Sequence, residues 1–519
     1  MSNPKMCFMC LQPAKLRCEE CEADIWYCGH THGNYHRLDG SSQCSPVMIS
    51  FQEGIGRCLL ASRNIIAGEV IFFEHPIVVG PNNVTAPQCL ICNSKITETE
   101  IVCSCNYPMC SKICQDLHEG KRECQILGDI KLDLNYELIL PLRLLLTQDQ
   151  DHRAFLGTLM NHVEEKQQNK ENWMHLKHSV IEPLVQAFQG TISEIAVTEA
   201  LGVVEVNNYE IYNPLDCGYR GIFPMTSLMT HSCAPNSRHA MEKKSPWSNR
   251  CIATVDIPKG QDITTTYVPL ILSTQQRRSK LRESWYFDCM CSRCQDPTEF
   301  GSNLAGILCS KCSKKSFLLP ANPLNFDSVW LCVSEVCDNE LTRDQIAQIL
   351  DSLVERKDSL DRSDVHEFIN FLHESENILH INHYILNSLR RWIVSLFCRT
   401  TKGNPDPEAI TVSMLEAKVM IADKYLFVLN KIEPGLTRNR GRVLYEKADA
   451  QAKLANKKLE GGELDGLTFL ELLQDSSRLA MEASKCLRYD PEGSFESFIR
   501  SSSNFLIQEI DQFQKFLLI

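Results

Sequence analysis

The chain has 519 residues, with 53 basic and 65 acidic side chains and a formal net charge of −12. Its 43% hydrophobic and 8% aromatic content can fill several cores and excludes a mainly disordered chain. The acidic balance, without a Lys/Arg cluster, argues against direct nucleic-acid binding. There is no long apolar run and no signal-peptide pattern, so we expect no secretion and no membrane span, with residence in the cytoplasm, the nucleus or both.

The 26 cysteines are the most informative feature of the composition. Disulfides are disfavoured in a reducing compartment, so closely spaced cysteines there indicate zinc ligands. Residues 1–45 hold eight such ligands, which suffice for two tetrahedral zinc sites. They are Cys7, Cys10, Cys18, Cys21, Cys28, His32, His36 and Cys44.

Residues 46–88 have the pattern of β structure, with short apolar runs at 57–61 and 70–74 on either side of a hairpin-like break at Ala67-Gly68. A second ligand set follows in 89–124, in the same order as the first, so the two sets form an internal repeat of a two-zinc module. Its members are Cys89, Cys92, Cys103, Cys105, Cys110, Cys114, His118 and Cys124. Residues 125–200 then change to helical spacing, dense in leucine.

The β pattern returns from about 219, with a strand at 251–255 and another at 262–267 whose Ile263, Thr265 and Tyr267 share a face. Cys289, Cys291 and Cys294 need a fourth ligand, for which Cys233 is a natural partner. Four ribbon-type ligands follow: Cys309, Cys312, Cys332 and Cys337. Residues 341–519 have helical patterns, for example Ile346-Ile349-Leu350-Leu353 and Ile378-Ile381-Ile385, and small residues suited to close helix crossings at Ala448, Ala452, Ala480 and Ala483.

The alternative to zinc is that these cysteines are merely buried thiols. Small segments this poor in apolar residues need a metal to stay folded, which favours zinc, about six ions in all. Closed protein shells leave no open coordination position, so the zinc is structural. Five cysteines stand alone and are expected to be small core hydrophobes: Cys58, Cys217, Cys251, Cys398 and Cys486.

Three segments of the divided β region carry chemistry. In Glu53-Gly54-Ile55-Gly56-Arg57 two glycines let the backbone approach a ligand, although a lone G-x-G is more often a turn. Thr230-His231-Ser232-Cys233-Ala234-Pro235-Asn236 places polar groups and a thiol at a proline turn. The third is the strand that ends at Tyr267, which by itself would be a core aromatic.

In this order, with the second finger inserted and C-x-C-x2-C downstream, these segments resemble the SMYD family of SET-domain protein-lysine methyltransferases, most like the arthropod SmydA group. The resemblance implies an α+β multidomain fold: a SET β-fold split by a MYND zinc finger and a helical insert. We expect an N-terminal MYND-like finger (1–45), the first SET part (46–88), the MYND finger (89–124), the helical insert (125–218), the SET core (219–275), a post-SET segment (276–300), a zinc ribbon (305–340) and a helical, tetratricopeptide-like domain (341–519).

The resemblance further implies transfer of a methyl group from S-adenosylmethionine to a lysine of a histone or non-histone protein. It assigns cofactor contacts to Gly54, Gly56, Thr230, His231 and Phe287, and the active-site tyrosine to Tyr267. It makes Cys233 the fourth ligand beside Cys289, Cys291 and Cys294. No general base is obvious, and burial would help the substrate lysine to react in its neutral form.

The chain departs from the family pattern at two positions. Thr230 replaces an asparagine and offers one hydroxyl instead of an amide, and Trp285 replaces a tyrosine of the lysine channel. The alternative function is therefore a catalytically weak or inactive SET-fold adaptor that recruits partners through its MYND fingers, in transcriptional repression. We expect proline-containing peptides as finger ligands and a monomeric protein.

Overall fold

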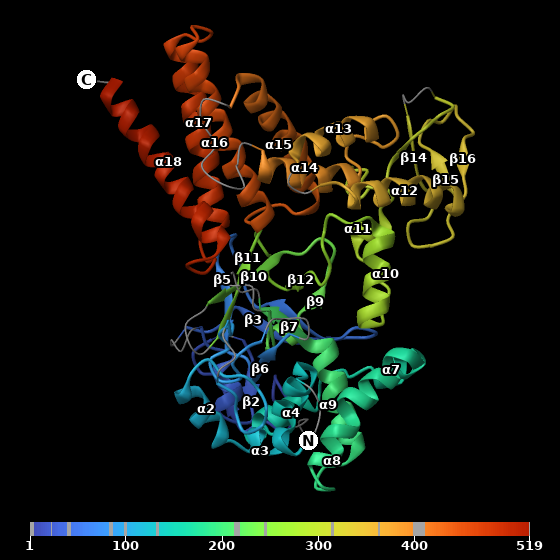
Figure 1. Cartoon of the computed structure of the whole chain (residues 1–519), viewed down its shortest axis with the longest axis vertical. Coiled ribbons are helices and arrows are strands. Elements are labelled where there is room, and N and C mark those ends of the chain that lie inside the picture. The colour runs from blue at the N-terminus through green and yellow to red at the C-terminus, as the bar shows by residue number, and fades with distance from the viewer. Residues whose placement is uncertain are drawn as a thin grey trace.

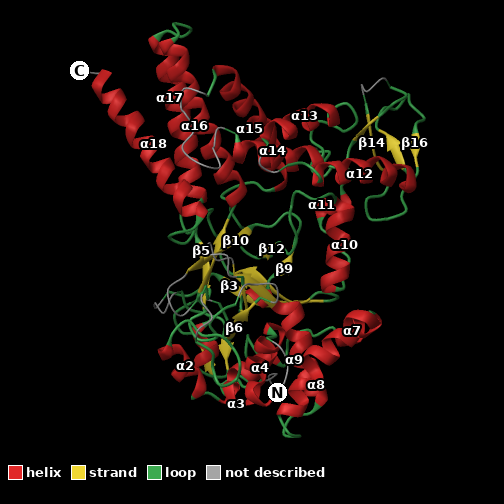
Figure 2. Ribbon diagram, in the orientation of Figure 1, coloured by secondary structure: helices red, strands yellow, loops and turns green. Residues whose placement is uncertain are grey.

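The computed structural model describes residues 5–21, 23–38, 43–82, 87–97, 101–130, 134–211, 218–242, 247–312, 316–361, 364–397 and 410–517. Figure 1 shows strands in the middle of the molecule, with the N-terminal region and a helical insert on one side and the C-terminal helices on the other. Figure 2 shows the same division by secondary structure, with a second group of strands beside the C-terminal helices.

The N-terminal finger is small and leads into a regular hairpin. It consists of the antiparallel pair β1 (Leu16–Arg17) and β2 (Trp26–Tyr27) followed by α1 (His30–Asn34). The hairpin pairs β3 (Val47–Gln52) with β4 (Gly56–Ala61); Gly54 of the G-x-G motif lies in the turn, and Gly56 is the first residue of β4. Leu59 and Ala61 of β4 are fully buried, which fixes the face that β4 turns to the core.

The remaining SET strands form two three-stranded antiparallel sheets and one short parallel pair. The first sheet has the order β10 (Ser237–Glu242), β11 (Ser248–Ala253), β5 (Val70–Glu74), and the second β6 (Val78–Pro81), β8 (Tyr219–Ile222), β7 (Asn208–Ile211). The parallel pair is β9 (Thr230–His231) with β12 (Thr264–Thr265).

Three expectations about these strands need correction. The runs at 57–61 and 70–74 do not form a hairpin, because β4 pairs with β3 and β5 with β11. The segment predicted as a helical insert ends in a strand, β7, which completes the sheet around β8. The strand predicted at 262–267 is regular only at Thr264–Thr265, although Ile263 and Thr265 are both buried as the alternation indicated.

The insert is helical, as its spacing predicts, and the second finger also ends in helical structure, which its sequence did not predict. Leu138 and Leu142 are buried in the core that joins them, while Leu140 is buried in the core of the SET strands. The helices are α2 (Lys112–Glu119), α3 (Arg122–Asp129), α4 (Ile139–Leu145), α5 (Gln150–Leu156), α6 (Val163–Gln168), α7 (Lys170–Leu176), α8 (Glu182–Ala187) and α9 (Glu194–Asn207), with shorter turns η1 (Tyr136–Leu138), η2 (Lys177–Ile181) and, later, η3 (Thr226–Leu228).

Helix α10 (Thr274–Trp285) runs along one side of the molecule between its two halves (Figure 1). It begins with a capping box of Ser273 and Gln276, which satisfies two backbone donors of its first turn. After the single turn α11 (Ser292–Gln295) comes a four-stranded antiparallel ribbon: β13 (Ile307–Leu308), β14 (Phe317–Pro320), β15 (Trp330–Cys332) and β16 (Glu340–Leu341).

The C-terminal domain is an array of helices whose neighbours in sequence pack together from α14 to α18. The helices are α12 (Arg343–Asp358), α13 (Val365–Ser375), α14 (Tyr384–Leu396), α15 (Val412–Ile432), α16 (Arg438–Glu460), α17 (Gly466–Cys486) and α18 (Phe495–Leu517). Ala448, Ala452, Ala480 and Ala483 are buried on α16 and α17, as predicted for a close crossing. The tetratricopeptide-like label stays a prediction.

One helical pattern in this domain is wrong. Ile378 and Ile381 lie in the connection between α13 and α14 and are 41% and 47% exposed, so only Ile385 is a core residue. The chain leaves the helical path because Leu379 bridges to Ile307 of the ribbon and the His383 side chain caps the start of α14.

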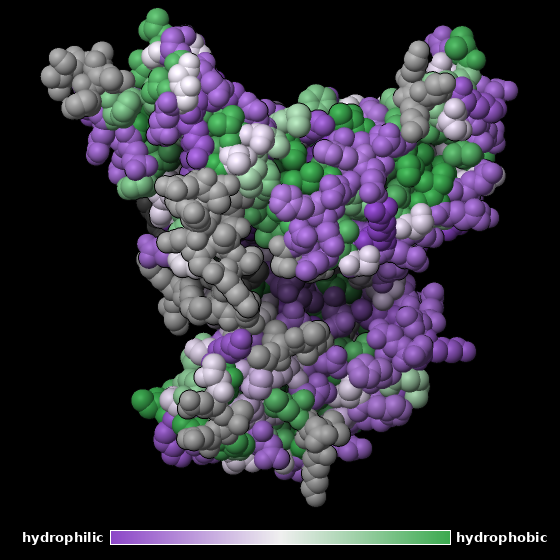
Figure 3. Space-filling view, turned by 45° about the horizontal axis from the view of Figure 1, so that its top comes forward, coloured by the Kyte–Doolittle hydropathy of each residue, from purple (hydrophilic) through white to green (hydrophobic). Residues whose placement is uncertain are grey.

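The α+β multidomain class is confirmed, with several separate cores. Among the described residues no helix has the length and apolar character needed to cross a bilayer. Figure 3 shows the molecule hollowed between the C-terminal helices and the half below them, with a mostly hydrophilic lining on the visible face.

Candidate active site and metal centres

The centre of the candidate site is the short parallel pair of β9 and β12. Each strand has only two paired residues, and the Ser232 backbone N–H adds a bond to the Thr265 carbonyl at 2.8 Å. The Asn236 side chain strengthens the pair: its amide donates to the Asp262 carbonyl at 2.7 Å and its oxygen accepts from the Thr264 N–H at 2.9 Å. The motif residues near 230–236 and 262–267 are thus held side by side.

Tyr267 leaves this pair with its hydroxyl directed at the backbone beside β9. The hydroxyl donates to the Met229 carbonyl at 2.6 Å, and the Tyr267 N–H donates to His231 Nδ1 at 3.1 Å. Because Nδ1 accepts, the imidazole proton lies on Nε2, which is 3.3 Å from the Cys233 sulfur. Burial raises the pKa of Tyr267 to about 12, so its hydroxyl is protonated at neutral pH.

Aromatic rings surround this tyrosine. Trp285 lies 5.3 Å from Tyr267 between ring centroids, and His231 lies 5.2 Å from Tyr267 and 5.9 Å from Phe287. Tyr286 has a left-handed backbone (φ 60°) that ends α10 and directs its ring to His162 of the insert, 5.3 Å away. The turn therefore places Trp285, and not Tyr286, against the candidate active-site tyrosine.

The glycine pair lies at the turn between β3 and β4. Gly54 and Gly56 have φ of +78° and +92°, and a Cβ atom at either position would meet nothing within 4 Å. Leu60 of β4 forms an antiparallel bridge with Asp262, so the two segments run in opposite directions. Gly56 is the first residue of β4, and Tyr267 follows the end of the other segment. The open backbone and Tyr267 thus lie at one end of the same strand pair.

Cys233, Cys289, Cys291 and Cys294 form one group in which the ligand atoms lie within 4.8 Å of one another. The Cys233 sulfur is 3.5 Å from that of Cys294 and 4.0 Å from that of Cys289. Four thiols at this separation suit a tetrahedral zinc ion. The group joins β9 to the segment after α10, which carries Phe287.

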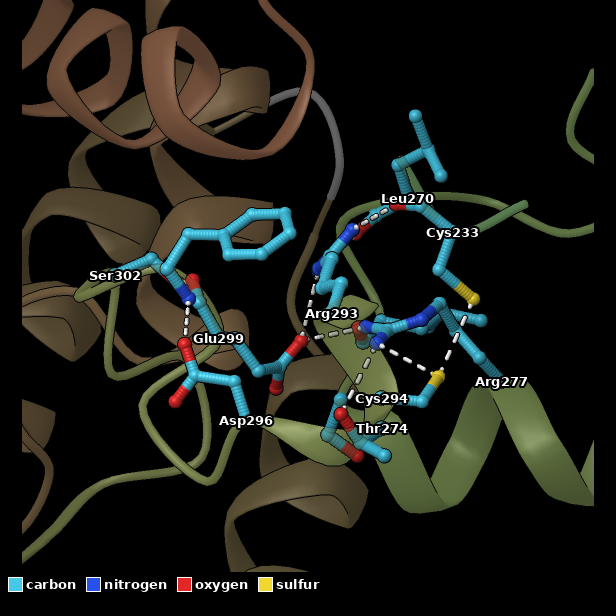
Figure 4. Close-up of polar contacts among 12 residues, drawn as sticks. Cys233, Leu270, Thr274, Arg277, Arg293, Cys294, Asp296, Glu299 and Ser302 are labelled. Atoms are coloured by element: carbon cyan, nitrogen blue, oxygen red, sulfur yellow. Dashed lines mark hydrogen bonds and ion pairs between the residues drawn. The ribbon is translucent and has the colours of Figure 1, made fainter. Parts of the chain in front are cut away.

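Buried charges surround this group, as Figure 4 shows. Arg277 donates to the Cys294 sulfur at 3.6 Å and pairs with Glu299 at 2.7 Å. Arg293 also pairs with Glu299, at 2.9 Å, and donates to the Cys233 carbonyl at 3.0 Å. Two guanidinium groups against one carboxylate leave a positive excess beside the thiols, which stabilises a net-negative four-thiolate zinc centre.

The finger ligands separate into two groups per finger, in interleaved order and with equivalent positions in the two repeats. In each group the ligand atoms lie within 4.8 Å of one another. The groups are Cys7, Cys10, Cys28 and His32; Cys18, Cys21, His36 and Cys44; Cys89, Cys92, Cys110 and Cys114; and Cys103, Cys105, His118 and Cys124. Sulfur and imidazole donors in fours suit zinc.

Cys105, whose C-x-C spacing is tight for one ion, lies 3.7 Å from His118 Nδ1. The other ring nitrogen of His118 meets Glu123 at 3.3 Å, and Glu123 is paired with Arg143 at 2.8 Å. Burial opposes ionisation of Glu123, but the bonds from His118 and Arg143 outweigh it and lower the pKa of this carboxyl to about 2. An ionised partner orients the imidazole toward a metal.

The ribbon sulfurs also lie close together. Cys309 is 3.7 Å from Cys337, and Cys312 is 3.8 Å from Cys332. Of the five isolated cysteines, Cys58, Cys251 and Cys486 are fully buried as expected, while Cys217 and Cys398 lie outside the described residues.

Sequence reasoning did not find several residues that support the site. The Met229 carbonyl, Arg277, Arg293 and Glu299 act through backbone or buried-charge contacts, and a spacing pattern does not reveal such contacts. Arg277 and Arg278 are adjacent basic residues that would be expected on the surface, whereas both side chains are buried.

Comparison with known proteins identifies the fold. The SET domain family matches residues 56–268, which contain the β9–β12 pair and Tyr267. The chain therefore contains a SET domain. The SET domain-containing protein SmydA-8, isoform A, of Drosophila melanogaster is 29% identical over 349 residues, covering 63% of this chain and 72% of that protein.

Two further relatives are named as methyltransferases. The histone-lysine N-methyltransferase ASHR1 of Arabidopsis thaliana is 26% identical over 300 residues, 51% of this chain and 59% of that protein. The human histone-lysine N-methyltransferase SMYD3 is 24% identical over 270 residues, 48% of this chain and 62% of that protein. The chain therefore carries a SET domain and is similar to SMYD-family proteins, among them SmydA-8.

Proposed function

We propose that this protein is a protein-lysine N-methyltransferase that uses S-adenosylmethionine. The observation that carries the proposal is that the open glycine turn, Tyr267 and the Cys233 group converge at one end of the SET strands. The relatives named above include histone-lysine methyltransferases, which supports the same reaction class.

The residues fit this cofactor. Gly54 and Gly56 leave free space over an exposed backbone turn, so main-chain groups can contact the methionine part. Thr230, His231 and Phe287 would border the remainder, with the Phe287 ring available for stacking on adenine. S-adenosylmethionine supplies an electrophilic methyl group on a sulfonium.

Tyr267 would orient the substrate. Its hydroxyl hydrogen is engaged by the Met229 carbonyl, so the oxygen lone pairs are free to accept from a lysine amine. Holding the amine in line with the methyl group accounts for most of the catalysis, since no side chain here serves as an obvious base. Aromatic walls exclude water and favour the neutral, nucleophilic amine.

The four-ligand groups and the ribbon would hold six zinc ions: two in each finger, one at Cys233 and one in the ribbon. Each is a closed set of protein donors with a structural role. Elemental analysis of the purified chain should give about six zinc per molecule. Three or fewer would refute the ligand assignment.

Isothermal titration with S-adenosylmethionine tests the central claim. Thr230 offers a shorter and simpler donor than asparagine, so we expect weakened binding, in the micromolar range, about −8 kcal/mol. If no heat of binding is measured at high protein concentration, the methyltransferase function is refuted and the adaptor function remains.

The second candidate function is a SET-fold adaptor with little or no activity. The close packing of Trp285 on Tyr267 favours it, because an indole there narrows a lysine channel. In that case the fingers would recruit proline-containing peptides, a role compatible with catalysis. We propose a monomer that resides in the cytoplasm, the nucleus or both, where free thiols bind zinc.

A further inference from the structure

The N-terminal finger is part of the SET core rather than an appended module. Cys7, Met9 and Cys10 have no exposed surface and pack in one apolar cluster with Leu59 of β4 and Ile263. A finger that served only to recruit partners would need few such contacts, because a flexible link suffices for recruitment.

Arg57 is the polar connection between this finger and the glycine turn. It follows Gly56 directly in β4, and its guanidinium donates to the Met9 carbonyl at 2.6 Å. Its other nitrogen donates to the carbonyl and hydroxyl oxygens of Thr158, at 2.9 and 2.7 Å. The carbonyl of Met9 belongs to the metal-binding loop between Cys7 and Cys10, so one side chain joins the finger, the turn strand and the insert.

The insert contacts the finger a second time. The Cys28 sulfur is 3.5 Å from a carboxylate oxygen of Asp151, and the Tyr35 hydroxyl is 3.1 Å from His152 Nε2. The finger is therefore braced on both sides of Arg57, and its position depends on the fold that zinc would impose on Cys7, Cys10, Cys28 and His32.

The second finger provides an internal comparison. Arg143 of α4 holds the equivalent loop, donating to the Leu90 carbonyl, between Cys89 and Cys92, at 2.6 Å. Its other contacts are the Val79 carbonyl of β6 at 2.5 Å and Glu123. In both fingers an arginine from outside the finger thus binds the equivalent metal-binding loop, but only Arg57 is adjacent to the glycine turn.

We propose that the first zinc finger is a structural part of the cofactor-binding lobe, with Arg57 as the positioning residue that fixes the Gly54–Gly56 turn to it. This rests on the proposed use of S-adenosylmethionine. The finger then sets cofactor affinity, and the second finger does not.

The matched pair Arg57→Lys and Arg143→Lys tests this. Lysine keeps the charge but replaces a planar fork by a single donor centre, so each variant loosens one finger by a similar amount. We expect Arg57→Lys to weaken S-adenosylmethionine binding by titration about tenfold, the loss of one charge-assisted hydrogen bond, and Arg143→Lys to stay within about twofold. Both should lower the melting temperature alike, so stability alone does not account for the difference.

A second pair alters the metal sites directly: Cys28→Ser in the first finger and Cys110→Ser at the equivalent place in the second. Each should lower the zinc content by about one ion, and only Cys28→Ser should weaken cofactor binding. If wild type binds and both members of either pair behave alike, the inference is overturned. If wild type itself does not bind, the proposed function fails instead. Should a serine variant not fold, the lysine pair decides.

Discussion

Tyr267 combines two properties that a core tyrosine need not share: a protonated hydroxyl held by a backbone carbonyl, and contacts with the rings of His231 and Trp285. Tyr267→Phe removes the hydroxyl alone. We expect methyl transfer to a lysine substrate to fall at least about hundredfold, because the amine loses its orienting partner. Stability should fall by about 1 kcal/mol, since the buried Met229 carbonyl loses a bond.

Two measurements separate catalysis from binding in this variant. S-adenosylmethionine affinity by titration should remain within about twofold of wild type, because the proposed role of Tyr267 is to orient the lysine amine and not to bind the cofactor. Undiminished turnover would exclude Tyr267 from the site.

Glu74 is a second residue whose environment controls its chemistry. It is buried in β5 and accepts from the Met225 and Thr226 backbone N–H groups at 2.6 and 2.9 Å and from the Thr226 hydroxyl at 2.5 Å. These donors begin η3, the turn that leads to Met229. Burial outweighs the bonds and raises the pKa of Glu74 to about 7, from an ordinary 4.5.

The direction in which stability changes with pH follows from proton binding to Glu74. Between pH 4.5 and 7 the folded carboxyl holds a proton that the unfolded one has lost, so its contribution to stability is complete below 4.5 and disappears as pH rises through 7. From pH 6 to 8 the wild type should lose about 1 kcal/mol from this group, and Glu74→Gln should lose none. Urea unfolding of both proteins measures this, and the zinc sites cancel in the difference. If the free energy of unfolding of the two proteins changes equally with pH, Glu74 is not the group responsible.

Among the elements, the β9–β12 pair is unusually short for its importance. With two paired residues in each strand, its own backbone bonds are few, and Asn236 supplies two more. The buried amide of Asn236 is thus a main connection between residues 230–236 and the approach to Tyr267, beside the bond from the Ser237 hydroxyl to the Thr264 carbonyl at 2.9 Å.

Asn236→Ala should loosen this pair. It leaves the Asp262 carbonyl and the Thr264 N–H without their partner, at a cost of about 2–3 kcal/mol. Hydrogen–deuterium exchange should accelerate across 262–267 and not in the ribbon. Asn322→Ala is the control, because Asn322 makes one similar bond, to Leu324 N–H at 3.0 Å, in an exposed loop. Equal protection of 262–267 in both variants would mean that Asn236 is dispensable.

The sequence predicted the elements whose signal is local. Examples are the closely spaced zinc ligands, the alternation of Ile263 and Thr265, and the amphipathic pattern of α12. Each of these can be read from residues that are close together in the sequence. Pairing is not local: β4 faces β3 and β5 faces β11 because of register and burial across long loops, so adjacent apolar runs were wrongly expected to form a hairpin.

The same distinction holds in the site. Tyr267, the glycines and the cysteine groups were named by motif, and the structure brings them together. Arg57, Arg293 and Glu74 were not found, because each acts on backbone groups far away in sequence. An isolated arginine or glutamate in the sequence does not indicate which distant backbone groups its side chain will contact.

At the scale of the whole molecule, two loops of the C-terminal helices rest on β10 and β11. Arg238 donates to the Cys486 carbonyl at 2.6 Å and pairs with buried Asp490 at 3.3 Å, and Arg438 donates to the His239 carbonyl at 2.6 Å. The Leu436 N–H reaches the Thr254 carbonyl at 2.8 Å. This contact holds the helices over the SET strands and maintains the hollow seen in Figure 3.

Gly435 lies in close contact with the SET part. Its φ is +82°, and an added Cβ would lie 1.9 Å from the Thr254 carbonyl oxygen, a backbone atom that cannot rotate away. Gly435→Ala should therefore push the helical domain off the SET strands. Gly493→Ala is the matched control, because Gly493 has a φ of +79° but nothing within 4 Å of the added atom.

Both variants carry the left-handed backbone cost of about 1–2 kcal/mol, and only Gly435→Ala adds the clash. We expect small-angle X-ray scattering to show a larger radius of gyration, and limited proteolysis to cut faster between the domains, for Gly435→Ala alone. Because the helices form one side of the hollow in Figure 3, we expect the affinity for a protein substrate to fall in the same variant while S-adenosylmethionine binding is retained. Equal behaviour of the two alanine variants would mean that backbone strain, and not domain contact, governs this position.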